Sequence, residues 1–365
     1  MICLPVCTLC GRSYPETGAP FLCECGGVFD YQQFPEYRAE TINPKMSGLW
    51  KYQSMLGLPD SALPITLGEG NTPLVETDFS RHPVWLKLEY QNPTGSYKDR
   101  GSAVLASFLL SRGVKSAVED SSGNAGASFA AYAARAGLQT QIFVPESASG
   151  PKRKQIEMYG AELVLVPGAR SEAARAVRQA ADQNIAYASH AYMPFGLTGI
   201  ATIAYEIAAS LGGNAPGTLV APVGHGGLLY GAIRGFKALK KAAVVDNEPY
   251  YVGVQTSGCA PVFTAFQNHE FSLREALESD TIAEGVRVKN PVRGAAILKA
   301  LSDGRGEILK VEEADLLNAN QEIAHRGFFV EPTSALVWAV LGKMIGNVPE
   351  PVVLILTGSG YKTQY

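Results

Sequence analysis

The sequence predicts an α/β fold of two lobes, each with a mainly parallel, twisted sheet flanked by helices, and a short cysteine-rich, ribbon-like segment at the N-terminus. Three observations support this prediction. With 365 residues, 46% of them hydrophobic, the chain can bury more than one core. From Val84 onward, short β-branched runs alternate with alanine-rich stretches, and a glycine ends these stretches about every two dozen residues. That interval fits one strand plus one helix, so the pattern favours parallel strands with helices on both faces.

The expected elements follow in order. Three helical stretches each end on a glycine, which can take the left-handed conformation of a helix cap: 100–113, 126–137 and 151–160. The runs between them are apolar enough for strands buried on both faces: 114–120, 138–146 and 161–168. Later in the chain, a strand at 217–224 leads into a helix at 226–241, and a last buried strand lies within 351–360.

Five of the six cysteines fall in the first 25 residues: Cys3, Cys7, Cys10, Cys23 and Cys25. In a reducing compartment this clustering indicates a metal more than disulfides. The pairs Cys7/Cys10 and Cys23/Cys25 could each offer two thiolates to one tetrahedral zinc ion across a hairpin. Four thiolates would close the coordination sphere, so such a zinc would be structural. The alternative is a ribbon that has lost its metal. We assign residues 1–30 to this cysteine-rich segment.

The bulk properties exclude several classes of partner. A net charge of −3 argues against nucleic acid or an anionic membrane surface as the main partner. No apolar run approaches the length that spans a bilayer, and the N-terminus lacks the basic-then-apolar order of an export signal. We therefore expect a cytoplasmic protein that acts on a small molecule.

Three glycine-containing turns lie where a predicted strand or loop meets a helix: 92–101, 119–128 and 222–231. In α/β folds ligands bind at such places. The turn "PVGHGGLLYG" could hold one phosphate, but it has neither the Walker lysine nor the dinucleotide-binding glycine pattern. Lys98, in "NPTGSYKDRG", lies at the expected N-terminus of a helix, where the dipole and desolvation favour a neutral, nucleophilic amine. A reactive lysine with a separate phosphate site indicates pyridoxal phosphate.

Seven motifs occur in the order typical of one enzyme group: "GEGNTPL", "NPTGSYKDRG", "SSGNAGAS", "PVGHGG", "AEGVRVKNPVR", "EPTSA" and "TGSGYK". On these motifs the chain resembles the threonine synthase branch of the fold type II, tryptophan synthase β-like enzymes that use pyridoxal phosphate. The resemblance implies a large cofactor-binding domain of residues 31–95 and 196–365. It also implies a smaller, mobile domain of residues 96–195.

The resemblance also implies a role for each matching residue. Lys98 matches the catalytic Schiff-base lysine, Asn124 the partner of the cofactor's 3′-oxygen, and Thr357 the hydroxyl that faces the pyridine nitrogen. The cofactor's phosphate would be bound by Gly224, His225, Gly226, Gly227 and Leu228. The substrate's α-carboxylate would be held by the turn Ser121, Ser122, Gly123 and Asn124. From the residues alone, Asn124 and the two serines could equally cap a helix, and Thr357 or Glu331 could belong to simple turns.

The substrate site departs from the family pattern. His190 and Ala191 replace the usual Asn-Ser pair, and Gly196 replaces an arginine that grips the substrate's phosphate. Losing a guanidinium removes a strong phosphate contact, so the leaving group of this substrate need not be phosphate. His190 or Arg293 could supply a substitute cation, while Arg293 could also serve only in a salt bridge.

Three functions remain open at this point. The first is a carbon–oxygen lyase like threonine synthase, which carries out β- or γ-replacement on an activated amino acid in amino-acid biosynthesis. The second is an ammonia-lyase that eliminates water or ammonia from a hydroxy- or diamino-acid. The third is a non-catalytic relative that keeps the fold and binds a ligand. We also expect a homodimer, as is common in this group.

Overall fold

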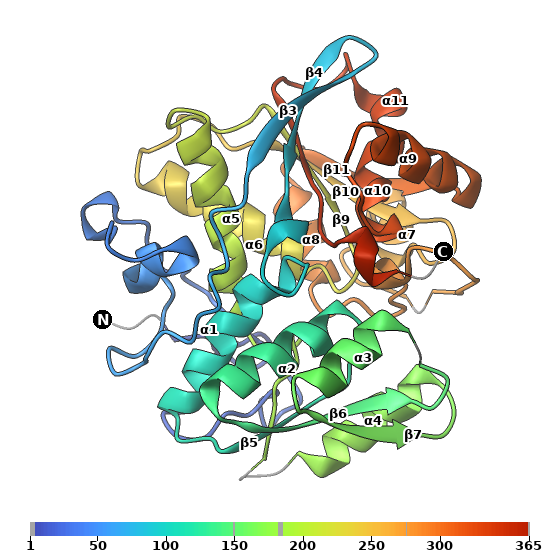
Figure 1. Cartoon of the computed structure of the whole chain (residues 1–365). Helices are drawn as coiled ribbons and strands as arrows, with labels where there is room; N and C mark the ends of the chain where they lie inside the picture. The colour runs from blue at the N-terminus through green and yellow to red at the C-terminus, as the bar shows by residue number, and fades with distance from the viewer. Residues whose placement is uncertain (1–3, 149, 182–184, 275, 364–365) are drawn as a thin grey trace. The chain divides into compact units, whose positions relative to one another are not determined.

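The computed structural model describes residues 4–148, 150–181, 185–274 and 276–363, and Figure 1 traces the chain through them. Its contacts divide the chain into two compact units. Unit 1 comprises residues 1–70, 92–200 and 362–365, and unit 2 comprises residues 71–91 and 201–361. Each unit has its own sheet and its own buried apolar cluster. Among the described residues, no helix is long and apolar enough to cross a membrane.

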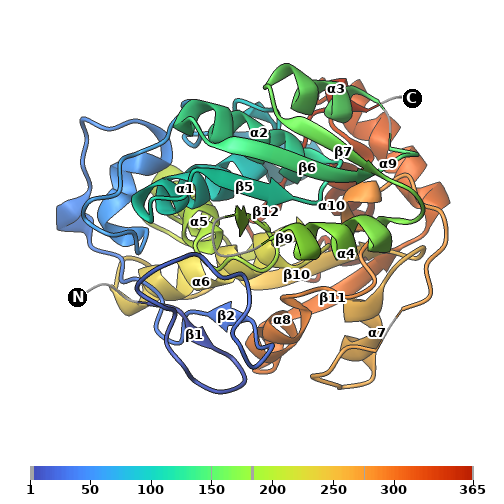
Figure 2. The same cartoon turned by 90° about the horizontal axis from the view of Figure 1, so that it is seen from below.

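Unit 1 contains a four-stranded parallel sheet in the order β7-β6-β5-β8. Its strands are β5 (Ser116–Glu119), β6 (Gln139–Pro145), β7 (Glu162–Val166) and β8 (Ile185–Tyr187). Its helices are α1 (Lys98–Ser111), α2 (Asn124–Ala136), α3 (Pro151–Met158) and α4 (Arg170–Ala180). Helices α2 and α3 cover one face of the sheet and α4 covers the other, as Figures 1 and 2 show. This arrangement confirms the predicted parallel sheet with helices on both faces.

The N-terminal part of unit 1 is a short ribbon. Strands β1 (Val6–Cys7) and β2 (Phe29–Asp30) pair antiparallel, and Tyr14 and Phe29 pack edge to face with ring centroids 4.7 Å apart. Tyr14 also packs on Phe108 of α1, with centroids 5.9 Å apart. The ribbon therefore shares the apolar cluster of unit 1.

Unit 2 contains a six-stranded sheet in the order β11-β10-β9-β12-β4-β3, which is parallel except at the β3 edge. Its strands are β3 (Leu74–Phe79), β4 (His82–Lys87), β9 (Thr218–Pro222), β10 (Tyr250–Thr256), β11 (Gly306–Val311) and β12 (Val352–Ile355). Its helices are α6 (Gly227–Lys241), α7 (Pro261–Gln267), α8 (Gly294–Leu301), α9 (Glu313–His325), α10 (Pro332–Ala339) and α11 (Leu341–Met344). The boundary between the units falls within α5 (Gly196–Ser210).

The two faces of this sheet can be told apart along β10. Val252 and Val254 pack into the cluster that contains residues of α9 and α10. A side chain at Gly253, between them, would meet Leu229 of α6 at 3.0 Å. Because successive residues of a strand point to opposite faces, α6 and α10 cover opposite faces of the sheet.

The predicted helix ends are confirmed. Gly113, Gly137 and Gly160 all have positive φ, and each lies within two residues of the end of α1, α2 or α3. Only glycine takes this conformation without steric cost, so the local sequence is enough to predict these ends.

The predicted domain boundaries stay a prediction, as does the mobility of residues 96–195. The compact units differ from those boundaries mainly in residues 31–70, which belong to unit 1. One reason is Glu69, which is fully buried and accepts hydrogen bonds from the Trp50 indole at 2.6 Å and the Tyr132 hydroxyl at 2.7 Å. Residues 1–3, including Cys3, lie outside the described residues.

Candidate active site and candidate metal centre

Lys98 is the first residue of α1, as the sequence predicts, and it is partly buried. The loop before it is held from two directions. The buried carboxylate of Asp99 accepts hydrogen bonds from the Thr94 N–H at 2.7 Å and the Thr94 hydroxyl at 2.5 Å. The Lys362 ammonium donates to the Thr94 carbonyl at 2.7 Å. These contacts fix the start of α1 and so the position of Lys98.

Close packing against α5 fixes the rest of that first turn. A Cβ atom at Gly199 would lie 2.1 Å from the Arg100 carbonyl oxygen, so only glycine fits there. Gly196 and Gly101 approach each other in the same way, with an added Cβ at Gly196 only 3.4 Å from the Gly101 backbone. The glycine at position 196 therefore serves helix packing in addition to replacing the family's arginine.

The turn 121–124 connects β5 to α2. Gly123 is the N-cap residue of α2 and Asn124 is its first helical residue, so the alternative that Asn124 caps this helix is wrong. The Ser121 hydroxyl accepts a hydrogen bond from the Gly123 N–H at 3.2 Å. A Cβ atom at Gly126 would lie 1.8 Å from the Ser121 carbonyl oxygen, so the helix approaches the turn as closely as glycine allows. The turn presents backbone N–H groups and serine hydroxyls, which suit a carboxylate.

Glu119 is a residue of this site that the sequence analysis missed. It is the last residue of β5 and is fully buried. One carboxylate oxygen accepts the Ser121 N–H, and the other lies 2.9 Å from Nδ1 of His190. Burial raises the pKa of Glu119 to about 7, while the Ser121 N–H and the charge of Lys98 oppose the rise. The one available signal was an acidic residue at the end of an otherwise apolar strand.

Unit 1 thus brings together several of the predicted residues. The charge of Lys98 acts on both Glu119 and His190, and Glu119 contacts the turn 121–124 directly. His190 follows β8, which neighbours β5 in the parallel sheet, so the two residues emerge from the same edge. This is the edge where ligands bind in such sheets.

In unit 2, the turn 224–228 leads from β9 into α6, as predicted. Gly226 is the N-cap residue of α6 and has a φ of 90°. A Cβ at Gly224 would lie 2.7 Å from the Gly285 carbonyl oxygen, so a side chain does not fit there either. The backbone N–H of Arg293 donates to the His225 carbonyl at 2.9 Å and ties the turn to the segment before α8. A bare backbone turn at a helix N-terminus fits a phosphate group.

Thr357 is buried directly after β12, where its hydroxyl lies 3.0 Å from the Ser334 hydroxyl of α10. The Ser334 oxygen also accepts hydrogen bonds from the Thr357 N–H at 3.0 Å and the Gly358 N–H at 2.9 Å. Glu331 is the N-cap residue of α10, ahead of Pro332. Ser334 therefore holds the Thr357 hydroxyl in a fixed position.

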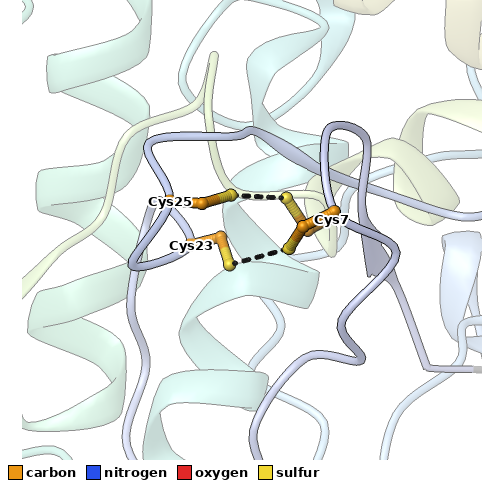
Figure 3. A group of neighbouring side chains, drawn as sticks. Cys7, Cys23 and Cys25 are labelled. Carbon is orange, nitrogen blue, oxygen red and sulfur yellow. Dashed lines mark hydrogen bonds between the residues drawn. The ribbon is translucent and has the colours of Figure 1, made fainter.

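The four predicted metal ligands lie together in the ribbon. The Sγ atoms of Cys7, Cys10, Cys23 and Cys25 all lie within 4.8 Å of one another. Figure 3 shows the two short contacts, Cys7 to Cys25 at 3.4 Å and Cys10 to Cys23 at 3.7 Å. Four sulfurs at about 2.3 Å from one zinc ion would be separated by about 3.8 Å, so this cluster fits a tetrahedral metal.

The backbone around the cysteines favours thiolates. A Cβ atom at Gly27 would lie 2.3 Å from the Cys7 sulfur, so the glycine leaves room for that sulfur. The pKa of Cys7 is lowered to about 6, first because the Cys10 backbone N–H bonds to its sulfur, although burial opposes this. Thiolates, not thiols, bind metal.

Comparison with known proteins agrees with the motifs. A family model described as pyridoxal-phosphate dependent enzyme matches residues 65–358. Threonine synthase of Methanocaldococcus jannaschii is 32% identical, over 98% of this chain and 92% of the relative. Threonine synthase of a Synechocystis species is 34% identical, over 85% of this chain and 82% of the relative.

Solved structures agree on the fold. A threonine deaminase from the organism abbreviated T.th. is 26% identical with a TM-score of 0.67, covering 80% of this chain and 94% of the other. A maize serine racemase is 18% identical with a TM-score of 0.70, covering 80% and 88%. The chain therefore belongs to the fold type II pyridoxal-phosphate-dependent enzymes, in the branch that contains the threonine synthases.

Proposed function

We propose that this protein is a carbon–oxygen lyase that replaces a leaving group on the side chain of an activated amino acid, as threonine synthase does. The observation that carries the proposal is the 32% identity to a threonine synthase over 98% of the chain. Because His190 and Gly196 stand where the family has its phosphate-binding side chains, the substrate is O-phosphohomoserine or a related amino acid with another leaving group.

Each proposed role follows from the position of the residue. Lys98 attaches the cofactor and moves the Cα proton, since it lies beside the 121–124 turn that suits the substrate carboxylate. The turn 224–228 binds the phosphate of the cofactor, because its glycines leave the backbone exposed. Asn124 and Thr357 hold the ring, and the hydroxyl of Thr357 is oriented by Ser334. When bound, pyridoxal phosphate supplies the electron sink that makes the Cα proton acidic.

A second candidate function is elimination from a hydroxy- or diamino-acid with release of a keto acid. The observation in its favour is the similarity to the threonine deaminase, at 26% identity over 80% of this chain. Both functions use the same proton transfer at Lys98. They differ in whether a nucleophile is added before the product leaves.

A panel of amino acids separates the two functions. Purified protein loaded with pyridoxal phosphate is incubated with O-phosphohomoserine, O-acetylserine, serine, threonine and 2,3-diaminopropionate. We expect phosphate or acetate release without an equal amount of keto acid, because replacement keeps the amino group on the product. Keto acid formed in equal amount to the leaving group would instead establish the lyase function, and no turnover of any compound would reject both.

We further propose that the ribbon binds one structural zinc ion through Cys7, Cys10, Cys23 and Cys25, on the basis of their mutual distances. Protein purified without chelator should contain about one zinc per chain. Cys10→Ser should lose that zinc and lower the melting temperature, because three thiolates bind the ion less tightly. Cys259→Ser, at the buried cysteine of unit 2, should keep the zinc. Metal analysis that finds no zinc in the wild-type protein would reject this assignment.

A further inference from the structure

A buried carboxylate fixes the position of one imidazole ring beside the proposed catalytic lysine. The Glu119 side chain is 0% exposed, and the His190 side chain is 21% exposed. Oε1 of Glu119 lies 2.9 Å from Nδ1 of His190, and the backbone N–H of Ser121 donates to Oε2. The carboxylate is therefore held from both sides, by the ring and by the turn that suits the substrate carboxylate.

This contact determines which ring nitrogen carries the proton. An ionised carboxylate can only accept, so Nδ1 must be the donor. The pKa of His190 lies well below its ordinary value, first because the ring is buried and then because Lys98 and Arg170 are positively charged. A neutral ring with its proton on Nδ1 has a lone pair on Nε2. This is the state of a histidine that acts as a general base.

The other charged groups around the pair leave this arrangement in place. Asp120, next to Glu119, accepts a hydrogen bond from the Tyr187 hydroxyl at 2.8 Å, and burial raises its pKa to about 6. Lys98 and Arg170 supply the positive charges that act on Glu119 and favour its ionised form. The pair is thus a carboxylate and an imidazole with two cations nearby.

We propose that His190 is the general base that takes the proton from the incoming nucleophile, and that Glu119 is the residue that positions it. The proposal rests on the replacement function proposed above. In that reaction H–Nu and R–X give R–Nu and H–X. The Nu–C bond forms, the C–X bond breaks with its electron pair leaving on X, and the proton of H–Nu passes through Nε2 to X or to solvent.

The variant Glu119→Gln tests the proposal because it reverses the tautomer. The Ser121 N–H needs an acceptor, so the amide oxygen of the glutamine faces Ser121 and its NH₂ group faces Nδ1. Nδ1 must then accept, which moves the ring proton to Nε2 and blocks the base. NMR of ¹⁵N-histidine-labelled protein should show the His190 proton on Nδ1 in the wild type and on Nε2 in Glu119→Gln. His190→Asn identifies the signal.

The kinetic test compares two nucleophiles. With water, the ratio of replacement product to keto acid should fall at least about 10²-fold in Glu119→Gln and in His190→Asn. With azide, an anion that has no proton to give up, the ratio should stay at the wild-type value. Exchange of the substrate α-proton in D₂O should also stay at the wild-type rate, because it depends on Lys98.

The pH profile gives a further check. Since burial raises the pKa of Glu119 to about 7, the carboxylate is protonated below that pH and stops accepting from Nδ1. Replacement with water should therefore fall as the pH falls through about 7, and this limb should be absent in Glu119→Gln.

Two results would overturn the proposal. One is a wild-type His190 with its proton on Nε2, and the other is an unchanged product ratio with water in both variants. Neither is the same as failure of the proposed replacement function. That failure would show as wild-type protein that exchanges no amino-acid α-proton, and the NMR result would still decide the state of the Glu119–His190 pair.

Discussion

Replacing Lys98 with alanine should lower kcat at least about 10³-fold on whichever amino acid the panel identifies, while the protein stays folded. Lys98 begins α1, and its amine is the one that acts electrostatically on Glu119 and His190 beside the 121–124 turn. The variant loses both the attachment point of the cofactor and the group that moves the Cα proton. The fold should persist because Asp99, Thr94 and Lys362 hold the start of the helix without Lys98.

A matched control is Lys115→Ala. Lys115 is exposed in the loop that follows α1, so its loss removes the same charge without touching the site. We expect wild-type activity and an unchanged circular dichroism spectrum. Borohydride reduction and peptide mass spectrometry add a direct readout, since the pyridoxyl group should be found on the peptide that contains Lys98. Full activity of Lys98→Ala, or the adduct on another lysine, would contradict the assignment.

The parts of the fold that the sequence predicts are those that depend on local chemistry. The left-handed glycine at Gly137 and the buried run of β6 need no knowledge of distant residues. The same holds for Lys98 at the start of a helix, because the turn formers before it and the alanine-rich stretch after it are adjacent in the chain. For the pairs Cys7/Cys10 and Cys23/Cys25, spacing alone predicted a cluster that the ribbon does form.

The parts that were missed depend on contacts between distant segments. Glu119 and His190 are 71 residues apart, and they meet because β5 and β8 are neighbours in a sheet whose strand order differs from the chain order. Residues 31–70 show no strand or helix periodicity. They belong to unit 1 because Glu69 accepts bonds from Trp50 and from Tyr132 of α2. No periodicity in the sequence encodes these pairings.

The most destabilising single substitution that we predict lies in the core of unit 2. Lys87, at the end of β4, and Glu206, in α5, form an ion pair of 2.7 Å with side chains that are 0% and 4% exposed. The lysine also donates to the Thr72 carbonyl at 2.6 Å, and the Asn71 N–H donates to the other glutamate oxygen at 2.8 Å. Lys87→Met would leave the carboxylate buried without its cation. Such a change costs about 3–5 kcal/mol of unfolding free energy.

Guanidinium unfolding followed by tryptophan fluorescence measures this effect, since Trp85 and Trp338 both lie in unit 2. The control is Lys289→Met, because Lys289 pairs with Glu278 at 3.3 Å on the surface, and such pairs contribute less than about 1 kcal/mol. The double variant Lys87→Met with Glu206→Leu should cost less than the sum of the two single variants, because it leaves no unpaired buried charge. Equal midpoints for Lys87→Met and the wild type would show that this ion pair does not hold β4 against α5, and strictly additive costs would show that the two charges do not stabilise each other.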